Sequence, residues 1–84
     1  MNIQVKFFAQ LKEKLGCGEL TLSFPSESVT VSEVKSALSS KGSVWQKSLA
    51  DGHVLMAVNH DLVVESFSVE DGDEVAFFPP VTGG

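Results

Sequence analysis

The 84-residue sequence contains no arginine, a single cysteine and no long uninterrupted apolar run. Nucleic acid is disfavoured as a partner, because arginine supplies the bidentate contacts to phosphate and the net charge is −5. Cys17 has no second cysteine for a disulfide, so the fold must depend on a packed core, as suits a reducing compartment. No segment approaches the roughly 18 apolar residues of a membrane span, and no export signal is evident, so we expect a soluble cytoplasmic protein with no membrane partner.

Charge is divided unevenly along the sequence. Residues 1–47 hold six lysines and four acids, a net charge of +2, whereas residues 48–84 hold seven acids and no lysine, a net charge of −7. Complementary potentials speed the encounter of two proteins, so this composition favours partners with basic surfaces. We expect the acids before the last predicted strand, Asp71, Asp73 and Glu74, to contribute to such steering.

Several short segments alternate apolar and polar residues, which is the pattern of half-buried strands. They are residues 3–7, residues 20–24, two strands on either side of a turn at residues 59–61, and residues 74–78. Pro79 ends the last strand, because proline has no amide hydrogen for a sheet ladder.

Two helices and one further helical turn are predicted between these strands. The first is a two-turn helix that follows Phe8 and ends at Gly16, a residue type that tolerates a left-handed cap. The main helix spans residues 31–41, because Thr30 and Glu33 have capping-box spacing and apolar residues recur three and four apart. Beyond it, a short turn is expected to place Trp45 over the edge of the core.

The order strand, short helix, strand, main helix and three strands predicts an α+β fold. We expect a mixed sheet of about five strands with one main helix packed across it, which is the ubiquitin-like β-grasp layout. The domain should comprise residues 1–78, and residues 79–84 should form a flexible, extended C-terminal tail.

Strand parity places two phenylalanines on the face of the sheet away from the helix. Phe8 follows the inward-facing Phe7, and Phe78 follows the inward-facing Phe77. In a β-grasp fold the first and last strands are neighbours, so Phe8 and Phe78 should lie close together and draw in Leu62. An exposed apolar patch of this kind marks an interface, so these three residues are the candidate partner-binding residues.

The other chemically active side chains form no recognisable site. His53 and His60 lie in or beside turns, near Asp51 and Asp61, but no established ligand spacing is present, so we expect solvated turn residues and no metal site. Cys17 has no histidine nearby in sequence and no lysine-rich setting, and is interpreted as incidental.

The last nine residues, AFFPPVTGG, run from an aromatic pair through two prolines to Gly83 and Gly84. The prolines stiffen the start of this segment, and the glycines allow the backbone to pass through a narrow channel. Fully extended, residues 79–84 reach about 20 Å, enough to enter a pocket in another subunit.

Three segments together resemble the small subunits of molybdopterin synthase, which are ubiquitin-like sulfur carriers. They are the opening MNIQVKFFAQL, the tripeptide Ala57-Val58-Asn59 and the final DGDEVAFFPPVTGG, and the likeness covers essentially the whole chain. The final segment is the most specific of the three.

The resemblance implies that an activating enzyme uses ATP to adenylate the carboxylate of Gly84, which is then converted to a thiocarboxylate. The carrier would insert its tail into the large synthase subunit and donate the sulfur to cyclic pyranopterin monophosphate, in molybdenum cofactor biosynthesis. Two carriers would flank a large-subunit dimer in a heterotetramer. The carrier would bind no cofactor and donate sulfur without catalytic residues of its own, since those are expected on the large subunit. The implied tail residues are Pro79, Pro80, Val81, Thr82 and Gly83.

Three alternatives remain open at this point. A similar carrier supplies sulfur for the thiamin thiazole, although the FFPPVTGG tail argues against it. A ubiquitin-like protein modifier would typically carry a basic segment before its glycines, where this chain has Pro79-Pro80-Val81-Thr82. A plain interaction domain would leave the two glycines unexplained.

Overall fold

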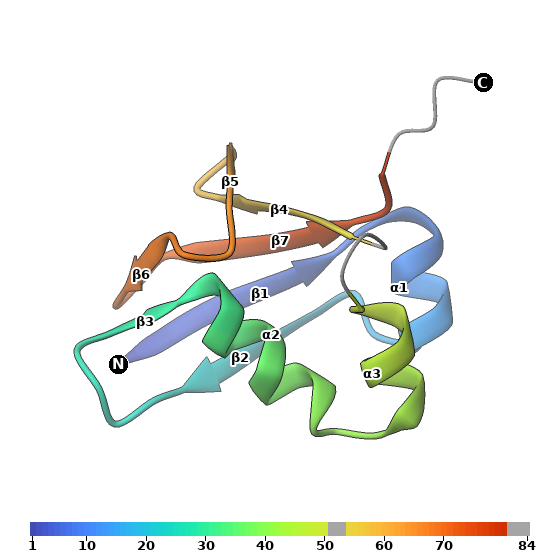
Figure 1. Ribbon diagram of the computed structural model, residues 1–84, viewed down its shortest axis with the longest axis horizontal. Coiled ribbons are helices and arrows are strands. Elements are labelled where there is room, and N and C mark those ends of the chain that lie inside the picture. The colour runs from blue at the N-terminus through green and yellow to red at the C-terminus, as the bar shows by residue number, and fades with distance from the viewer. Residues whose placement is uncertain (51–53, 81–84) are drawn as a thin grey trace.

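A five-stranded mixed sheet forms the centre of the computed structural model, which describes residues 1–50 and 54–80 (Figure 1). The central strand β7 runs parallel to its neighbour β1, and the other neighbouring strands are antiparallel. The mixed sheet of the predicted β-grasp fold is thereby confirmed. In spatial order the strands are β2 (Glu19–Ser23), β1 (Asn2–Phe7), β7 (Glu74–Phe78), β4 (Leu55–Val58) and β5 (Asp61–Val63).

A second, two-stranded sheet was absent from the sequence prediction. It pairs β3 (Ser28–Thr30) with β6 (Ser68–Glu70), so the prediction of only three strands after the main helix is wrong. Each of these strands has three residues and a single buried apolar side chain, Val29 or Val69. Such short segments carry too little alternation for a period-two pattern, and only their mutual pairing defines them.

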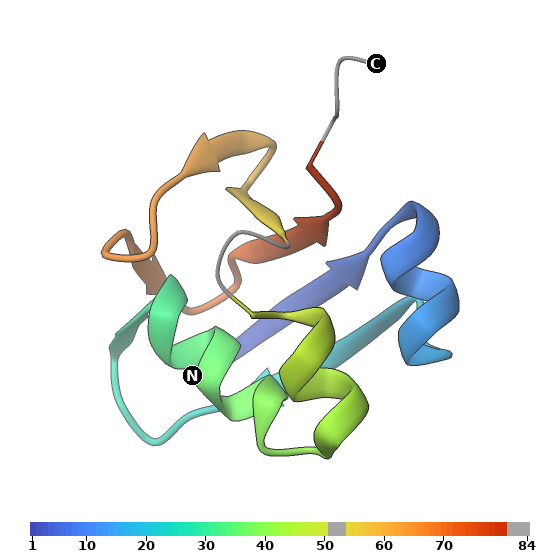
Figure 2. The same ribbon diagram turned by 45° about the vertical axis from the view of Figure 1, so that its right-hand side comes forward.

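Three helices accompany the sheet: α1 (Ala9–Leu15), α2 (Val31–Ser39) and α3 (Ser43–Ser48). Figure 2 shows α2 and α3 on the same face of the five-stranded sheet. The predicted left-handed cap of α1 is confirmed, since Gly16 has φ 65°. The Thr30 hydroxyl accepts a hydrogen bond from the amide of Glu33, as the capping-box spacing indicates. The last turn of α2 differs from the prediction, because its regular part ends at Ser39 rather than at residue 41.

The core lies between the sheet and these helices. The Phe7 and Phe77 rings stack with centroids 6.0 Å apart, and Trp45 meets Phe7 edge-on at 5.5 Å. Trp45 is half-buried at the edge of the core, as predicted. Within residues 1–50 and 54–80, no helix is long and apolar enough to cross a membrane. The fully buried apolar side chains come from the first and last strands, from β6 and from α2, and include Ile3, Val5, Phe7, Val31, Val34, Leu38, Val69, Val75 and Phe77.

The β4–β5 turn is tied to β7 by Asn59, whose backbone amide donates to the Glu74 carbonyl at 2.9 Å. The turn predicted at residues 59–61 is confirmed, and Asn59 and His60 both have positive φ there, 50° and 75°. The Asn59 side chain accepts a hydrogen bond from the Glu74 amide and donates one to Asp73 Oδ1, both at 3.0 Å. This side chain therefore ties the turn to the start of β7.

Two substitutions of Asn59 separate its backbone role from its side-chain role. Asn59→Gly removes two hydrogen bonds and should cost about 1–3 kcal/mol of unfolding free energy. Asn59→Ala removes the same two hydrogen bonds but keeps a β-carbon at positive φ, which glycine lacks, so it should cost about 1–2 kcal/mol more than Asn59→Gly. Urea denaturation of both variants measures the difference, and equal stabilities would show that the turn relaxes to negative φ when the side chain is lost.

Candidate functional site

The face of the sheet opposite α2 and α3 carries the three residues predicted to bind partners. Phe8 is 47% exposed, Leu62 is 69% exposed and Phe78 is half-buried. The neighbouring residues Phe7 and Phe77 are fully buried on the helix side, so the alternation inferred from strand parity is confirmed.

Phe8 and Phe78 occupy adjacent positions because β1 and β7 are paired in parallel. Phe7 lies opposite Phe77 in the register, and the Phe8 amide donates to the Phe77 carbonyl at 3.1 Å. Phe8 itself has extended backbone angles, φ −123° and ψ 157°, so the alternation of β1 continues one residue beyond the strand. The parallel pairing of β1 and β7 therefore places the two aromatic residues side by side on the open side of the sheet.

Leu62 lies on the same face but is not adjacent to the phenylalanines. It pairs with Ala57 on β4, and Ala57 pairs in turn with Ala76 on β7. Leu55 pairs with Phe78 and is itself exposed. We refer to the resulting apolar surface as the open face, made of Phe8, Leu55, Ala57, Leu62, Ala76 and Phe78.

The sequence prediction missed Leu55, Ala57 and Ala76 as members of this face. The available signal was the parity of β4, because Met56 and Val58 are buried in the core. That parity sends Leu55 and Ala57 to the other side of the sheet.

A charged group borders the open face. Glu74 lies 3.2 Å from Lys6 Nζ and 3.8 Å from His60 Nε2. The His60 side chain is 87% exposed, in agreement with a solvated turn residue. Among the described residues, no group of three His, Cys, Asp or Glu side chains could hold a metal ion. His53 lies outside the described residues.

Cys17 follows Gly16, the cap of α1, and is half-buried. Its Sγ donates to the Glu19 carbonyl at 3.3 Å. The interpretation of this cysteine as incidental stays a prediction.

β7 leads directly from the open face into the predicted tail. Pro79 is half-buried and Pro80 is exposed immediately after Phe78. The remaining tail residues of the sequence prediction, Val81, Thr82, Gly83 and Gly84, lie outside the described residues. Because Phe78 and Pro79 are consecutive, a protein that covers the open face is brought next to the start of the tail.

Phe78→Ala is expected to weaken binding of a protein partner at the open face by about 1–3 kcal/mol, the range for a central aromatic anchor. The side chain is only half-buried and lies outside the core, so the loss of stability should be small. Calorimetric titration with the partner and thermal unfolding separate the two effects. A large drop in melting temperature with unchanged affinity would contradict this assignment.

The architecture and this strand-to-tail arrangement define a ubiquitin-like β-grasp protein. The family model described as the ThiS family matches residues 5–84, and the chain belongs to this family. Within it, the chain is 44% identical over 84 residues to the molybdopterin synthase sulfur carrier subunit of Escherichia coli, covering 98% of this chain and 99% of the relative. The protein of the same name from Haemophilus influenzae is 40% identical over 82 residues, with 98% and 99% covered.

A solved structure with the same fold is SAMP1 from Haloferax volcanii. It superposes with a TM-score of 0.83 at 26% identity, and the match covers 100% of both chains. The likeness supports the β-grasp assignment over the whole chain.

Proposed function

We propose that the protein is the sulfur carrier subunit of a molybdopterin synthase. The observation that carries this proposal is the 44% identity, over nearly the full length of both proteins, to a sulfur carrier subunit of that synthase. The position of the predicted tail, which follows the open face on β7, supports it. The cytoplasmic location expected from the sequence is part of the same proposal.

The chemistry centres on the carboxylate of Gly84. A carboxylate is a poor acyl donor. In the first step, on an activating enzyme, the Gly84 carboxylate attacks ATP, which forms an acyl adenylate and releases pyrophosphate. Hydrosulfide then displaces AMP: a C–S bond forms as the C–O bond to AMP breaks, which leaves a thiocarboxylate on Gly84. In the synthase, the thiocarboxylate gives its sulfur to cyclic pyranopterin monophosphate and water restores the carboxylate. The carrier binds no cofactor in this scheme, and the catalytic groups belong to its partners.

The open face supplies docking energy that a tail alone would lack. Ordering free backbone costs about 1–2 kcal/mol per residue, so inserting residues 79–84 into a partner would offset much of a binding energy. Pro79 and Pro80 lower this cost because their φ is already fixed. Burial of the open face contributes about 25 cal/mol per Å² of apolar area, which offsets the cost of ordering the tail. The large synthase subunit and the activating enzyme are therefore both proposed to cover this face.

A ubiquitin-like protein modifier is the second candidate, because a small archaeal modifier protein has the same fold. Its chemistry would start from the same acyl adenylate but end in an amide with a lysine of a target protein. The identity to sulfur carriers is higher, 44% against 26%, and favours sulfur transfer.

Intact-mass spectrometry of the protein from its native cell tests the two functions together. A sulfur carrier should show a fraction of molecules in which one oxygen is replaced by sulfur, and the replacement should map to Gly84 after digestion. Gly84 joined to lysines of other proteins, with no thiocarboxylate, would overturn the proposal in favour of the modifier.

A further inference from the structure

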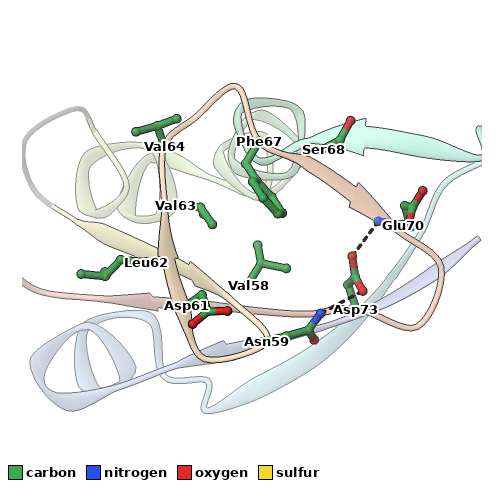
Figure 3. A pocket seen from close by; sticks show the side chains of 10 residues that line it. All are labelled: Val58, Asn59, Asp61, Leu62, Val63, Val64, Phe67, Ser68, Glu70 and Asp73. Atoms are coloured by element: carbon green, nitrogen blue, oxygen red, sulfur yellow. Dashed lines mark hydrogen bonds between the residues drawn. The ribbon is translucent and has the colours of Figure 1, made fainter.

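A second apolar surface lies in a groove between the β4–β5 hairpin and β6, and it borders the open face at Leu62. Figure 3 shows Val58, Val63 and Phe67 pointing toward one another inside it, while Leu62 points away. The groove has a volume of about 710 Å³. We refer to it as the β5–β6 groove. Its polar rim consists of Asn59, Asp61, Ser68, Glu70 and Asp73.

The floor and one wall of the β5–β6 groove are apolar. Val58 forms the floor and is buried, whereas Phe67 is 44% exposed and Val63 is half-buried. A phenylalanine that stays this exposed beside two valines offers surface that a bound side chain could remove from water.

Both walls of the groove are held by hydrogen bonds, so the cavity is formed before anything binds. On one side, the amide of Val31 at the start of α2 donates to the Phe67 carbonyl at 3.0 Å, and the Phe67 amide donates to Val64 at 3.0 Å. On the other side, Asn59 is tied to Asp73 and Glu74. A preformed groove binds with little loss of conformational entropy.

The acids of the rim divide into two kinds. Asp73 is engaged within the protein: Oδ1 accepts from Asn59 at 3.0 Å and Oδ2 accepts from the Glu70 amide at 2.8 Å. Asp61 and Glu70 are exposed at opposite sides of the groove. These two carboxylates are the rim groups that face an incoming ligand.

The acids that the sequence analysis expected to attract partners, Asp71, Asp73 and Glu74, are also engaged within the protein. Asp71 accepts a hydrogen bond from the Asn2 amide at 2.6 Å, Asp73 holds the β4–β5 turn, and Glu74 pairs with Lys6. Replacing these three would disturb local structure as well as charge. Asp61 and Glu70 are better placed to attract a basic partner.

We propose that the β5–β6 groove binds a segment of a partner protein that presents an apolar side chain beside a lysine or arginine. The apolar side chain packs among Val58, Val63 and Phe67, and the cation lies against Asp61 or Glu70. A second copy of this chain is disfavoured, because a two-fold contact would bring identical acids together. Anionic membranes and nucleic acid are disfavoured by the same charges.

The position of the groove leaves the tail accessible while it is occupied. Figures 1 and 2 place β6 and α1 at opposite ends of the molecule, and the last residues of β7 lie on the side of α1. Asp73, on the rim, precedes the first residue of β7, and the strand then runs for about 13 Å to Phe78. A protein held in the groove therefore leaves the part of the open face around Phe8 and Phe78 free for another protein. This arrangement does not depend on whether Gly84 carries sulfur.

The test uses the full chain, labelled with ¹⁵N, and the capped peptide acetyl-Gly-Lys-Leu-Lys-Gly-amide as the probe. Peptide binding should shift the amide resonances of Val58, Val63 and Phe67, with a dissociation constant on the order of millimolar for so small a ligand. Phe67→Ala should weaken binding by roughly 10-fold, and Asp61→Asn with Glu70→Gln should remove most of its salt dependence. Val44→Ala, which truncates a similarly exposed apolar residue on α3, is the matched control and should bind as the unmodified protein does.

Two further peptides define the outcomes that overturn the proposal. Replacing the leucine by glycine should abolish the shifts at the groove, and replacing both lysines by glutamate should do the same. Equal shifts with the leucine-free peptide would mean that charge alone attracts the probe. Shifts spread over the whole acidic surface, or unaltered by Phe67→Ala, would place the binding site elsewhere. Concentration-dependent shifts without peptide would identify a second copy as the occupant.

Discussion

Deleting Gly84, or adding one residue after it, should reduce sulfur transfer by at least about 100-fold while leaving the domain folded. The proposed chemistry needs a carboxylate at a fixed distance from the docked open face. One residue changes the reach of an extended chain by about 3.5 Å, and a misplacement of about 1 Å in a reacting group already costs this much in rate. The buried core described by the structure ends at Phe77, so neither change removes a core contact.

Gly84→Ala is the matched control for length, because it keeps the carboxylate at the same position in the chain. It should retain more activity than either length variant, and its remaining loss reports how narrow the partner's channel is. Synthesis of molybdopterin from purified components measures transfer, and circular dichroism checks the fold. Normal product formation by a length variant would rule out Gly84 as the sulfur-bearing residue.

Phe77→Ala should destabilise the domain by about 3–5 kcal/mol, the usual cost of removing a buried phenylalanine. Its side chain is fully buried on the central strand β7 and stacks on Phe7. Domains of this size rarely have more than about 5–10 kcal/mol of stability, so a large share of the unfolding free energy would be lost.

The neighbouring Phe78→Ala variant is the control for this experiment. The two substitutions remove the same atoms from consecutive positions, but Phe78 is half-buried on the open face. Urea denaturation should therefore show a much larger loss for Phe77→Ala than for Phe78→Ala. Similar losses would mean that the open face contributes to the core, against the alternation seen in the structure.

Strand alternation was sufficient to predict which phenylalanines face the core. Phe7 and Phe77 fall on the helix side and Phe8 and Phe78 on the other, because parity depends only on local sequence. The same reasoning did not show that β4 separates Leu62 from Phe78, since strand order is a property of the whole sheet. The local alternation therefore predicted the face of the sheet on which each side chain lies. The residues that lie beside it on that face depend on how the strands pair.

The β5–β6 groove could not be found from the sequence. Val58 reads as an ordinary strand residue, and Phe67 lies outside every strand that the pattern predicted. They face each other only because the β3–β6 pairing and the bond from Val31 to Phe67 position the segment beside the β4–β5 hairpin. Contacts of this kind depend on short pieces of backbone with almost no periodic signal.

The parallel pairing of β1 with β7 also has a consequence for how the protein is made. Gln4 lies opposite Glu74, so the central pair cannot form until almost the entire chain has been synthesised. Closing so long a loop makes the topology slow to fold and leaves fragments that lack Glu74–Phe78 without the middle of their sheet. Proteolysis should remove such fragments readily, and every chain long enough to present a tail has already acquired the strand that completes its domain.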